Sequence, residues 1–514
     1  MYSIVSTAMI QGIAGIPVSV EADVSDGMPV FEMVGFLASE VKEAKERVRA
    51  ALRNLGYTLP PKRITVNFTP ADIRKSGAGF DLPVAIAVLS ALGIVPREEL
   101  RGLFVIGEIG LNGNVQPVHG VLPMVAGAKE HGIRRCMIPD ANLSEAALVT
   151  DMECCGVADI AEAIRVLKHE EVTGTGREVQ TKKQQVKRQQ AKKQPDFSDI
   201  KGQKLLRRAC ETAVSGMHNF LMIGPPGAGK TMLAMRIPSI LPPLGPSEQM
   251  ELSKIYSVSG LFGEREGLMN ERPFRAPHHT ITPQGLAGGG VIPKPGEVSL
   301  AHKGVLFLDE LPEFQSATLE ILSQPMEEKA VRLVRNHGTF RYPADFMLVA
   351  AMNPCRCGYY PDMQKCRCTQ NAIERYLGRI SQPLIDRIDM CVEAPRLEFG
   401  ELTGTGEEES SESIRERVIC AQRIQRERYR NMDFQFNSQI PAVQIRTFCA
   451  LNRRQEQYME QIYKSMNLTA RSYHKILKVA RTLADMDAEE QIQDRHLNEA
   501  VCYRSMDKKF WEKA

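Results

Sequence analysis

The sequence predicts an α/β protein of several domains, in which a central parallel sheet is followed by a helical C-terminal region. Three observations support this prediction. The chain has 514 residues, which suggests about three domains at roughly 150 residues each. Short apolar runs in its middle each end at a polar side chain, as buried parallel strands do. From about Ser413 onward, apolar residues recur at helical spacing among Arg, Gln and Glu.

Charge and composition are those of a globular protein. The 65 Lys and Arg residues nearly balance the 62 Asp and Glu residues, so any nucleic-acid-binding surface must be local. No run approaches the roughly 18 apolar residues that cross a bilayer, and Met1–Ser6 lacks the charged start of an export signal. We therefore expect a cytoplasmic protein with no membrane partner, whose twelve cysteines are thiols or metal ligands rather than disulfides.

The first predicted core strand is the apolar run Phe220–Ile223, and a glycine-rich segment follows it. That segment fits the pattern G-x-x-x-x-G-K-[ST] at every fixed position. It consists of Gly224, Pro225, Pro226, Gly227, Ala228, Gly229, Lys230 and Thr231. In such a loop, backbone N–H groups approach the phosphates, the lysine meets the β- and γ-phosphates, and the hydroxyl binds Mg²⁺. The segment thus predicts a site for a nucleoside triphosphate such as ATP, with magnesium.

Two more apolar runs end at polar side chains that suit the same site. Val305–Leu308 precedes Asp309 and Glu310. In phosphate-loop enzymes this arrangement puts the aspartate behind the metal and the glutamate against the attacking water. With the threonine of the glycine-rich segment, Asp309 would therefore hold Mg²⁺. Phe346–Met352 precedes Asn353, which would orient the water or sense the γ-phosphate, although asparagine at a strand tip is also a common turn former.

Four cysteines directly after Asn353 form two C-x-C pairs separated by eight residues: Cys355, Cys357, Cys366 and Cys368. Four thiolates that face one another across a short loop can hold a tetrahedral zinc ion, although C-x-C spacing is less usual than C-x₂-C. The alternative is a set of incidental reduced thiols. We favour zinc, because paired cysteines on both sides of a turn at Gly358–Pro361 are hard to explain otherwise.

Two arginines near the C-terminal helices are candidates for nucleotide contacts. Thr469 is predicted to cap a helix with one apolar face, which carries Tyr473, Ile476, Leu477, Ala480 and Leu483. Arg471 then falls in the first turn, where it either reaches the γ-phosphate or is an ordinary surface arginine. Arg387, in the run Leu384–Asp389, is a candidate to reach the nucleotide of a neighbouring subunit, which requires an oligomer.

Two polar segments separate these parts. Thr181–Pro195 carries six cations and little aliphatic surface, so burial cannot offset the entropy lost on ordering it. It is either a basic strap that touches phosphates or, as we favour, a solvated tether. Gly404–Glu412 is acidic and is predicted to be an exposed loop.

Together these residues carry a resemblance that spans essentially the whole chain. The sequence is similar to the magnesium-chelatase-like AAA+ ATPases of the YifB/ComM group through the segments Gly224–Thr231, Phe274–Thr280, Gly288–Gly290, Ser299–His302, Leu308–Phe314, Asn353–Cys355 and Asp386–Asp389. The resemblance implies a non-proteolytic domain like that of Lon protease at 1–170, a basic linker at 171–195, an AAA+ core with a helix-2 insertion and the cysteine cluster at 196–400, and a helical lid at 401–514. It also implies that Asn353 is sensor 1, Arg387 the arginine finger and Arg471 sensor 2.

The N-terminal domain resembles serine–lysine peptidases but has lost their catalytic pair. Arg74–Asp81 occupies the place of the nucleophile segment. On that pattern Gly79 stands where the serine would be and Leu122 where the lysine would be, so acyl transfer has neither nucleophile nor base. Lys75 and Ser76 are adjacent, and consecutive strand residues point to opposite faces. We therefore expect a binding or assembly module.

The resemblance implies an ATP-dependent hexameric motor that acts on single-stranded or branched DNA, with branch-migration helicase activity in recombination or natural transformation. In such a ring the segment between Ser257 and Glu297 would line the pore. The basic residues that would meet phosphates in or near it are Lys294, Arg272, Arg275, Arg332, Arg335 and Arg341. Two alternatives stay open, a protein-remodelling ATPase and a metal-chelatase-type ATPase subunit.

A second metal site could be formed by three histidines, His278, His279 and His302. Histidines in loops also pack as ordinary polar side chains, and we favour that interpretation.

Overall fold

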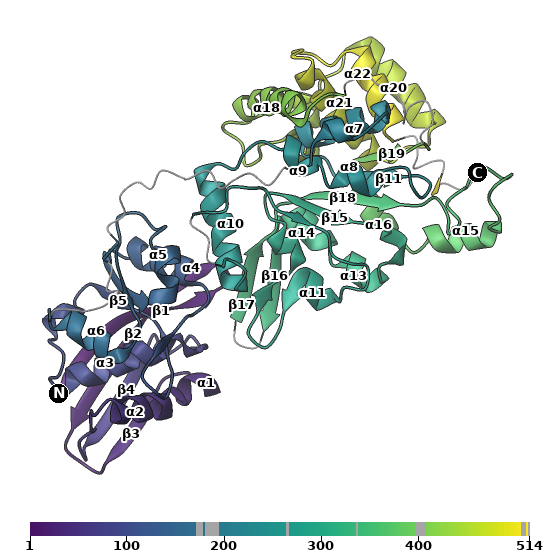
Figure 1. The fold of residues 1–514 in the computed structure, drawn as a ribbon. Coiled ribbons are helices and arrows are strands. Elements are labelled where there is room, and N and C mark those ends of the chain that lie inside the picture. The colour runs from purple at the N-terminus through teal and green to yellow at the C-terminus, as the bar shows by residue number, and fades with distance from the viewer. Residues whose placement is uncertain are drawn as a thin grey trace.

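The computed structural model describes residues 1–170, 195–263, 267–335, 338–396, 408–504 and 510–511, together with the backbone of 178–179. An N-terminal α+β domain, a central parallel sheet and a C-terminal helical region follow one another along the chain (Figure 1). The predicted linker Thr181–Pro195 lies outside the described residues except for Pro195. Within the described ranges, no helix is both long and apolar enough to span a membrane.

The N-terminal domain is built on an eight-stranded sheet of order β10-β9-β8-β5-β1-β2-β4-β3. Its longest pair is the antiparallel hairpin of β1 and β2, whereas β5, β8 and β9 run parallel to one another. The strands are β1 (Tyr2–Gln11), β2 (Ala14–Ser25), β3 (Val30–Val34), β4 (Arg63–Thr69), β5 (Leu103–Val105), β8 (Arg135–Pro139), β9 (Glu153–Val157) and β10 (Glu178–Val179). A separate small hairpin joins β6 (Glu108–Ile109) and β7 (Val115–Gln116).

Helices cover both faces of this sheet. Successive side chains of a strand point to opposite faces, so one strand contributes to two cores. In β1, Val5 and Met9 enter one hydrophobic core, with α2, α3 and α6, whereas Ala8 enters a second core, with α4 and α5. The helices are α1 (Ser39–Lys42), α2 (Ala44–Asn54), α3 (Asp81–Ala91), α4 (Val121–Glu130), α5 (Leu143–Ala146) and α6 (Ile160–Leu167). The domain thus buries apolar surface on both sides of its sheet.

The central sheet has five parallel strands in the order β12-β15-β18-β11-β19. They are β12 (Phe274–Arg275), β15 (Val305–Leu308), β18 (Met347–Met352), β11 (Phe220–Ile223) and β19 (Met390–Glu393). The three predicted strands are confirmed as β11, β15 and β18. Because β18 lies between the other two and all three run parallel, their carboxyl ends meet at one edge of the sheet.

Short helices and two hairpins surround this sheet. The helices are α7 (Lys204–Gly216), α8 (Lys230–Ala234), α9 (Ile237–Ile240), α10 (Pro246–Ser259), α11 (Pro283–Ala287), α12 (Glu297–Leu300), α13 (Ser316–Glu320), α14 (Ser323–Glu328), α15 (Gln370–Leu377) and α16 (Gln382–Ile385). One hairpin joins β13 (Gly288–Gly289) to β14 (Lys294–Pro295), the other β16 (Ala330–Arg335) to β17 (Gly338–Pro343). The hydroxyl of Tyr342 donates to the Pro293 carbonyl at 2.6 Å, which ties the two hairpins together.

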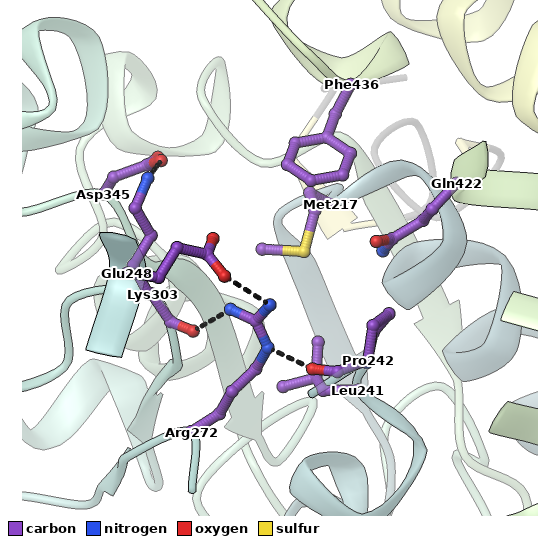
Figure 2. A pocket seen from close by; sticks show the side chains of 9 residues that line it. All are labelled: Met217, Leu241, Pro242, Glu248, Arg272, Lys303, Asp345, Gln422 and Phe436. Atoms are coloured by element: carbon purple, nitrogen blue, oxygen red, sulfur yellow. Dashed lines mark hydrogen bonds and ion pairs between the residues drawn. The ribbon is translucent and has the colours of Figure 1, made fainter. Parts of the chain in front are cut away.

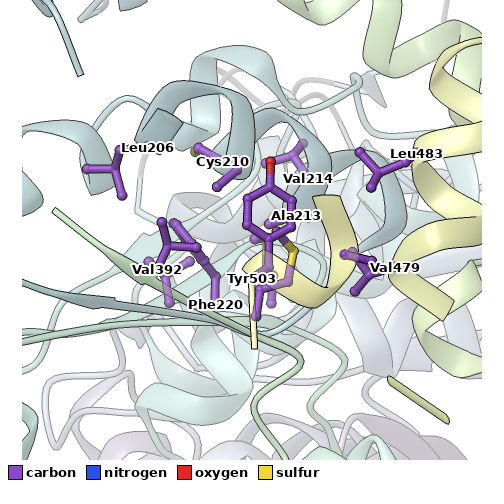
Figure 3. Close-up of a cluster of buried hydrophobic side chains, with 14 of the residues drawn as sticks. Leu206, Cys210, Ala213, Val214, Phe220, Val392, Val479, Leu483 and Tyr503 are labelled. Atoms are coloured by element: carbon purple, nitrogen blue, oxygen red, sulfur yellow. The ribbon is translucent and has the colours of Figure 1, made fainter. Parts of the chain in front are cut away.

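The C-terminal helices share a hydrophobic core with the central sheet. They are α18 (Ser411–Arg428), α19 (Ile445–Phe448), α20 (Arg453–Ser465), α21 (Ala470–Met486) and α22 (Asp494–Cys502). The predicted cap is confirmed, since the Thr469 side chain accepts the N–H of Ser472 at the start of α21. Figure 3 shows Leu483 of α21 in one cluster with Val214 of α7 and Phe220 of β11. The helical region therefore packs directly on the sheet.

The predicted exposed loop Gly404–Glu412 is wrong at its C-terminal end, where α18 begins at the buried residue Ser411. Glu408 forms an ion pair with Arg207 of α7, so this carboxylate is held by the core. Residues 404–407 lie outside the described part of the chain. The acidic run alone does not indicate that Arg207, about two hundred residues earlier in the sequence, pairs with Glu408. The exposed loop was predicted for that reason.

The N-terminal domain contacts the central part through α10 and through the β16–β17 hairpin. Buried Glu145 accepts hydrogen bonds from the Ser257 hydroxyl of α10 and, at 3.0 Å, from the Leu122 N–H of its own domain. The Nε2 of Gln11 donates to the carbonyl of Thr339 in β17 at 3.4 Å. Both contacts link residues that are far apart in the sequence.

Candidate functional site

The glycine-rich segment lies at the carboxyl end of β11, between that strand and α8. The N–H of Gly224 donates to the carbonyl of Met352 at the end of β18 at 3.2 Å, which fixes the start of the segment against the neighbouring strand. Gly227 and Gly229 have φ angles of +78° and +82°, in the left-handed region that glycine adopts without strain. A Cβ at either position would meet no atom within 4 Å. The loop is thus open on the side where phosphates would lie.

Lys230 is buried at the base of this loop. Its ammonium donates to the carbonyls of Gly224 at 2.7 Å and Pro225 at 3.0 Å, and to Oδ1 of Asn353 at 3.1 Å. Burial lowers the pKa of Lys230 to about 8, because the charged form loses hydration that carbonyl dipoles only partly replace. An anionic phosphate beside the ammonium would stabilise its protonated, charged form. Asn353, predicted from the end of β18, is thus in direct contact with Lys230.

Thr231 and Asp309 also come together. The hydroxyl of Thr231 donates to Oδ2 of Asp309 at 2.7 Å, across 78 residues of sequence. Hard oxygen ligands of this kind, one hydroxyl and one carboxylate, suit Mg²⁺ bound between protein and phosphates. The donor set therefore fits magnesium.

Glu310 follows Asp309 at the tip of β15, with a left-handed φ of +52°. Its N–H donates to Oδ1 of Asp309 at 2.9 Å, and its own side chain is 59% exposed, so water can reach the carboxylate. The ring of His279 lies beside it, with Nδ1 3.6 Å from Oε2 of Glu310. This contact was not predicted from the sequence. The only signal was the Phe274–Thr280 motif itself, which says nothing of its partner.

The three histidines do not form a second metal site. His278 contacts Thr280 at 2.9 Å, and His302 pairs with Glu251 at 3.0 Å. The ring of His278 stacks on His279, with centroids 4.0 Å apart. Ordinary polar packing, which we favoured, describes these contacts.

Arg387 and Arg471 each contact a carboxylate of their own chain. Arg387 donates to Oε1 of Glu327 at 2.6 Å and to the carbonyl of Pro383 at 2.7 Å. Arg471 is exposed and its ion pair is with Asp386, the residue before Arg387, at 3.6 Å. Among the interactions of the described residues, neither arginine is joined to residues 224–231. Both guanidinium groups are thus paired with carboxylates of their own chain.

The four clustered cysteines converge to a single point. Their Sγ atoms all lie within 4.8 Å of one another, and three of the separations are 3.3, 3.7 and 3.6 Å. A tetrahedral zinc with Zn–S bonds of about 2.3 Å requires Sγ–Sγ edges of about 3.8 Å, whereas a disulfide requires about 2.05 Å. The geometry therefore fits a four-thiolate zinc site. Within the described residues, it is the one group of side chains that could hold a metal in this way.

Two of the basic residues expected to meet phosphates are engaged in the fold instead. Figure 2 shows the Arg272 guanidinium donating to the Pro242 carbonyl at 2.5 Å and to the Lys303 carbonyl at 2.6 Å, beside Glu248 at 3.2 Å. Arg275 forms two hydrogen bonds with the Glu297 carboxylate, at 2.6 and 2.7 Å. The prediction of a phosphate contact is therefore wrong for Arg272, and the Arg275 side chain is occupied by a carboxylate. Sequence position alone did not reveal these partners.

The remaining cations of that prediction are exposed on the two hairpins. Lys294 lies in β14, Arg332 and Arg335 in β16, and Arg341 in β17. Arg332 and Arg341 are directly opposite in the β16–β17 register, so they share one face of that hairpin. Residues 336–337, between β16 and β17, are outside the described part of the chain.

In the N-terminal domain, Gly79 and Leu122, which the resemblance aligns with the peptidase residues, carry no reactive group. Leu122 is fully buried in α4, and a Cβ on Gly79 would lie 3.2 Å from the Ile106 side chain. The nearby Lys75 is buried, and its ammonium donates to the carbonyls of Pro70 and, at 2.9 Å, Ile73. That ammonium is thus tied to its own loop.

Comparison with known families matches three parts of the chain. Residues 196–402 match the family described as magnesium chelatase, subunit ChlI. Residues 20–142 match subunit ChlI of Mg-chelatase, and residues 408–504 match the C-terminal part of magnesium chelatase subunit ChlI.

Individual relatives cover nearly the full length. The chain is 40% identical to competence protein ComM of Haemophilus influenzae over 507 residues, 98% of this chain and 97% of that protein. It is 39% identical to the uncharacterized protein YifB of Escherichia coli with the same coverage. A shorter match, 33% identical over 104 residues, covers 20% of this chain and 18% of Lon protease 2 of Bacillus subtilis.

Proposed function

The chain belongs to the magnesium-chelatase-like AAA+ family that includes ComM and YifB, and we propose that it is an ATP-dependent motor that acts on DNA. The family relationship makes it an AAA+-type ATPase related to competence. The proposal adds the substrate, single-stranded or branched DNA, the hexameric ring, and helicase activity in branch migration during recombination or natural transformation.

The meeting of three adjacent strand ends supports ATP hydrolysis more than any other observation. The ends of β11, β18 and β15 bring Lys230 to Asn353 and Thr231 to Asp309. In this proposal the open glycine backbone and Lys230 bind and orient the triphosphate, and Thr231 and Asp309 hold Mg²⁺. Bound there, Mg²⁺ would offset negative charge on the phosphates.

Glu310 acts on the attacking water in this proposal. Its exposed carboxylate takes the proton as the water attacks the γ-phosphate, while the Asn353 amide orients that water. The Asn353 oxygen accepts from the Lys230 ammonium, so the NH₂ group on the other side of the same amide would donate to the water or the phosphate.

The placement of the two arginines supports an oligomer. Arg387 pairs with Glu327, and no interaction among the described residues joins it to the phosphate loop (Gly224–Thr231) of its own chain, so in this proposal it stabilises the transition state in a neighbouring subunit. Arg471, paired with Asp386, would act as sensor 2. We therefore propose a homo-oligomer, and a hexamer as its form.

DNA binding is supported by the exposed hairpins. Lys294, Arg332, Arg335 and Arg341 gather on two hairpins that are joined through Tyr342. Repeated around a ring, these cations would line a channel that follows a phosphate backbone. The name of the relative from H. influenzae refers to competence, which agrees with a DNA substrate.

We also propose that the four cysteines bind Zn²⁺ and that the protein works in the cytoplasm. The Sγ separations support the metal. The structure describes all twelve cysteines and joins no pair of them in a disulfide, which is consistent with a reducing compartment.

Two other functions each have one observation in their favour. The family descriptions name magnesium chelatase, which favours a chelatase-type ATPase subunit. The Lon-like match favours a protein-remodelling ATPase. Both would use the same nucleotide site.

ATP turnover of the purified protein, measured without polymer and with single-stranded DNA, forked DNA, duplex DNA or an unfolded polypeptide, distinguishes these functions. We expect stimulation by single-stranded or forked DNA. Glu310→Gln should bind ATP and fail to release phosphate, because the phosphate contacts remain while the water loses its base. Stimulation by polypeptide alone would overturn the DNA proposal in favour of protein remodelling.

A further inference from the structure

We propose that zinc bound by the four cysteines holds the phosphate loop in its binding conformation, so that zinc occupancy sets the nucleotide affinity. The cysteine cluster then positions the nucleotide site rather than merely stabilising a distant loop. This inference rests on the proposed ATPase function, because it concerns the same site.

The first link is covalent. Asn353 contacts Lys230 through its side chain, and Cys355, fully buried, follows only two residues later. A metal that fixes Cys355 therefore also restrains the backbone from which Asn353 reaches the lysine.

The second link is a close packing contact. Gly358, directly after Cys357, has a φ of +83°, and a Cβ placed on it would lie 2.3 Å from Cδ of Pro226 in the phosphate loop. Pro226 thus rests on the bare backbone of the cysteine loop. Any shift of that backbone therefore either displaces Pro226 or breaks its contact with Gly358.

The cysteine loop packs against a hydrophobic core, but regular secondary structure does not fix its shape. From 354 to 369 the chain contains no helix or strand. Its few backbone hydrogen bonds include Gly358 to Cys355 at 3.0 Å and Cys366 to Asp362 at 2.7 Å. In short metal-binding loops of this kind, much of the ordering energy comes from the metal. Loss of zinc is therefore expected to release the support under Pro226 and Asn353 together.

The test measures two quantities on the full-length protein, the zinc content by elemental analysis and the affinity for a fluorescent ADP analogue with Mg²⁺. Neither requires DNA or hydrolysis. Wild type should carry one zinc per chain. Cys357→Ser with Cys368→Ser should lose zinc and bind the analogue about tenfold more weakly or worse, as small misplacements of binding groups cause. Cys368→His, which keeps a zinc ligand, should restore both zinc and affinity relative to Cys368→Ser.

A second variant separates positioning from loss of fold. Gly358→Ala keeps all four thiolates but pushes a methyl group against Pro226, so it should retain zinc and still bind the analogue more weakly. Gly132→Ala is the matched control, because Gly132 has a φ of +85° and its Cβ would meet no atom within 4 Å. That variant carries the same backbone strain without the contact and should bind like wild type.

The outcomes are distinguishable. Wild type without zinc, or a zinc-free cysteine variant that binds the analogue like wild type, overturns this inference and leaves the ATPase proposal intact. Equal affinities for Gly358→Ala and Gly132→Ala also overturn it. A wild-type protein that holds zinc but does not bind nucleotide at all overturns the proposed function, and this inference with it.

Discussion

Lys230 of the central part and Lys75 of the N-terminal domain are both buried, and both donate hydrogen bonds to backbone carbonyls of their own loops. Burial lowers the pKa of both ammonium groups. Their surroundings differ. Lys230 also meets the Asn353 side chain from another strand, beside an open glycine loop. The Lys75 ammonium contacts only carbonyls of its own loop. In that domain, the resemblance aligns Gly79 and Leu122 with the peptidase residues. A buried lysine indicates a site only where polar groups from separate elements converge on it.

Removing Lys230 should have the largest effect. In Lys230→Ala the triphosphate loses its principal cationic partner. We therefore expect the affinity for a non-hydrolysable ATP analogue to fall by about a hundredfold or more. Equilibrium binding with Mg²⁺ measures this, and thermal unfolding of the variant checks its fold. A change of less than about threefold would remove Lys230 from the phosphate site and with it the contrast between the two lysines.

Removing Lys75 should affect only the stability of the N-terminal domain. Lys75→Met leaves the carbonyls of Pro70 and Ile73 without their donor, at a cost of about 1–3 kcal/mol. Denaturant unfolding measures that loss, and the turnover number for ATP should not change. A large loss of turnover in a folded Lys75→Met protein would show that this domain contributes to catalysis.

Outside the N-terminal domain, some contacts were predictable from the sequence and others were not. Asp309 and Asn353 were predicted because a buried parallel strand directs the next polar residue to one edge, whatever the rest of the fold. Thr231 was predicted from the glycine-rich pattern that follows β11. The partners of Arg272 and Glu408 were missed, because each pair joins residues separated in the sequence and depends on how distant segments pack. The residue that follows a strand can be read from the local sequence, whereas an ion pair between distant segments cannot.

The pH dependence of nucleotide binding sharpens the contrast further. The Lys230 pKa of about 8 in the free protein means that the ammonium is largely protonated below pH 8 and loses its proton above it. A triphosphate favours the charged form, so binding takes up a proton at higher pH. The dissociation constant should therefore stay nearly constant below pH 8 and rise by up to about tenfold per pH unit above it.

Lys230→Arg is the control for this pH profile, because a guanidinium stays protonated throughout the range. Its affinity, whatever its absolute value, should show no such rise between pH 7 and 9.5. A wild-type profile parallel to that of Lys230→Arg would mean that the lysine is not the titrating group.

The smallest predicted effect concerns His279, which lies beside the exposed Glu310. In His279→Ala the carboxylate loses the neighbour that restricts its position, so turnover should fall about threefold to tenfold with little change in the Michaelis constant. His278→Ala is the matched control, since His278 is adjacent in sequence, stacks on His279 and contacts Thr280 rather than the glutamate. An equal loss in both variants would assign the effect to the stacked rings. A loss confined to His279→Ala would mean that the segment that follows β12 holds the Glu310 carboxylate in position. Among the described residues, the Lys75 ammonium has no comparable contact with a side chain from another element.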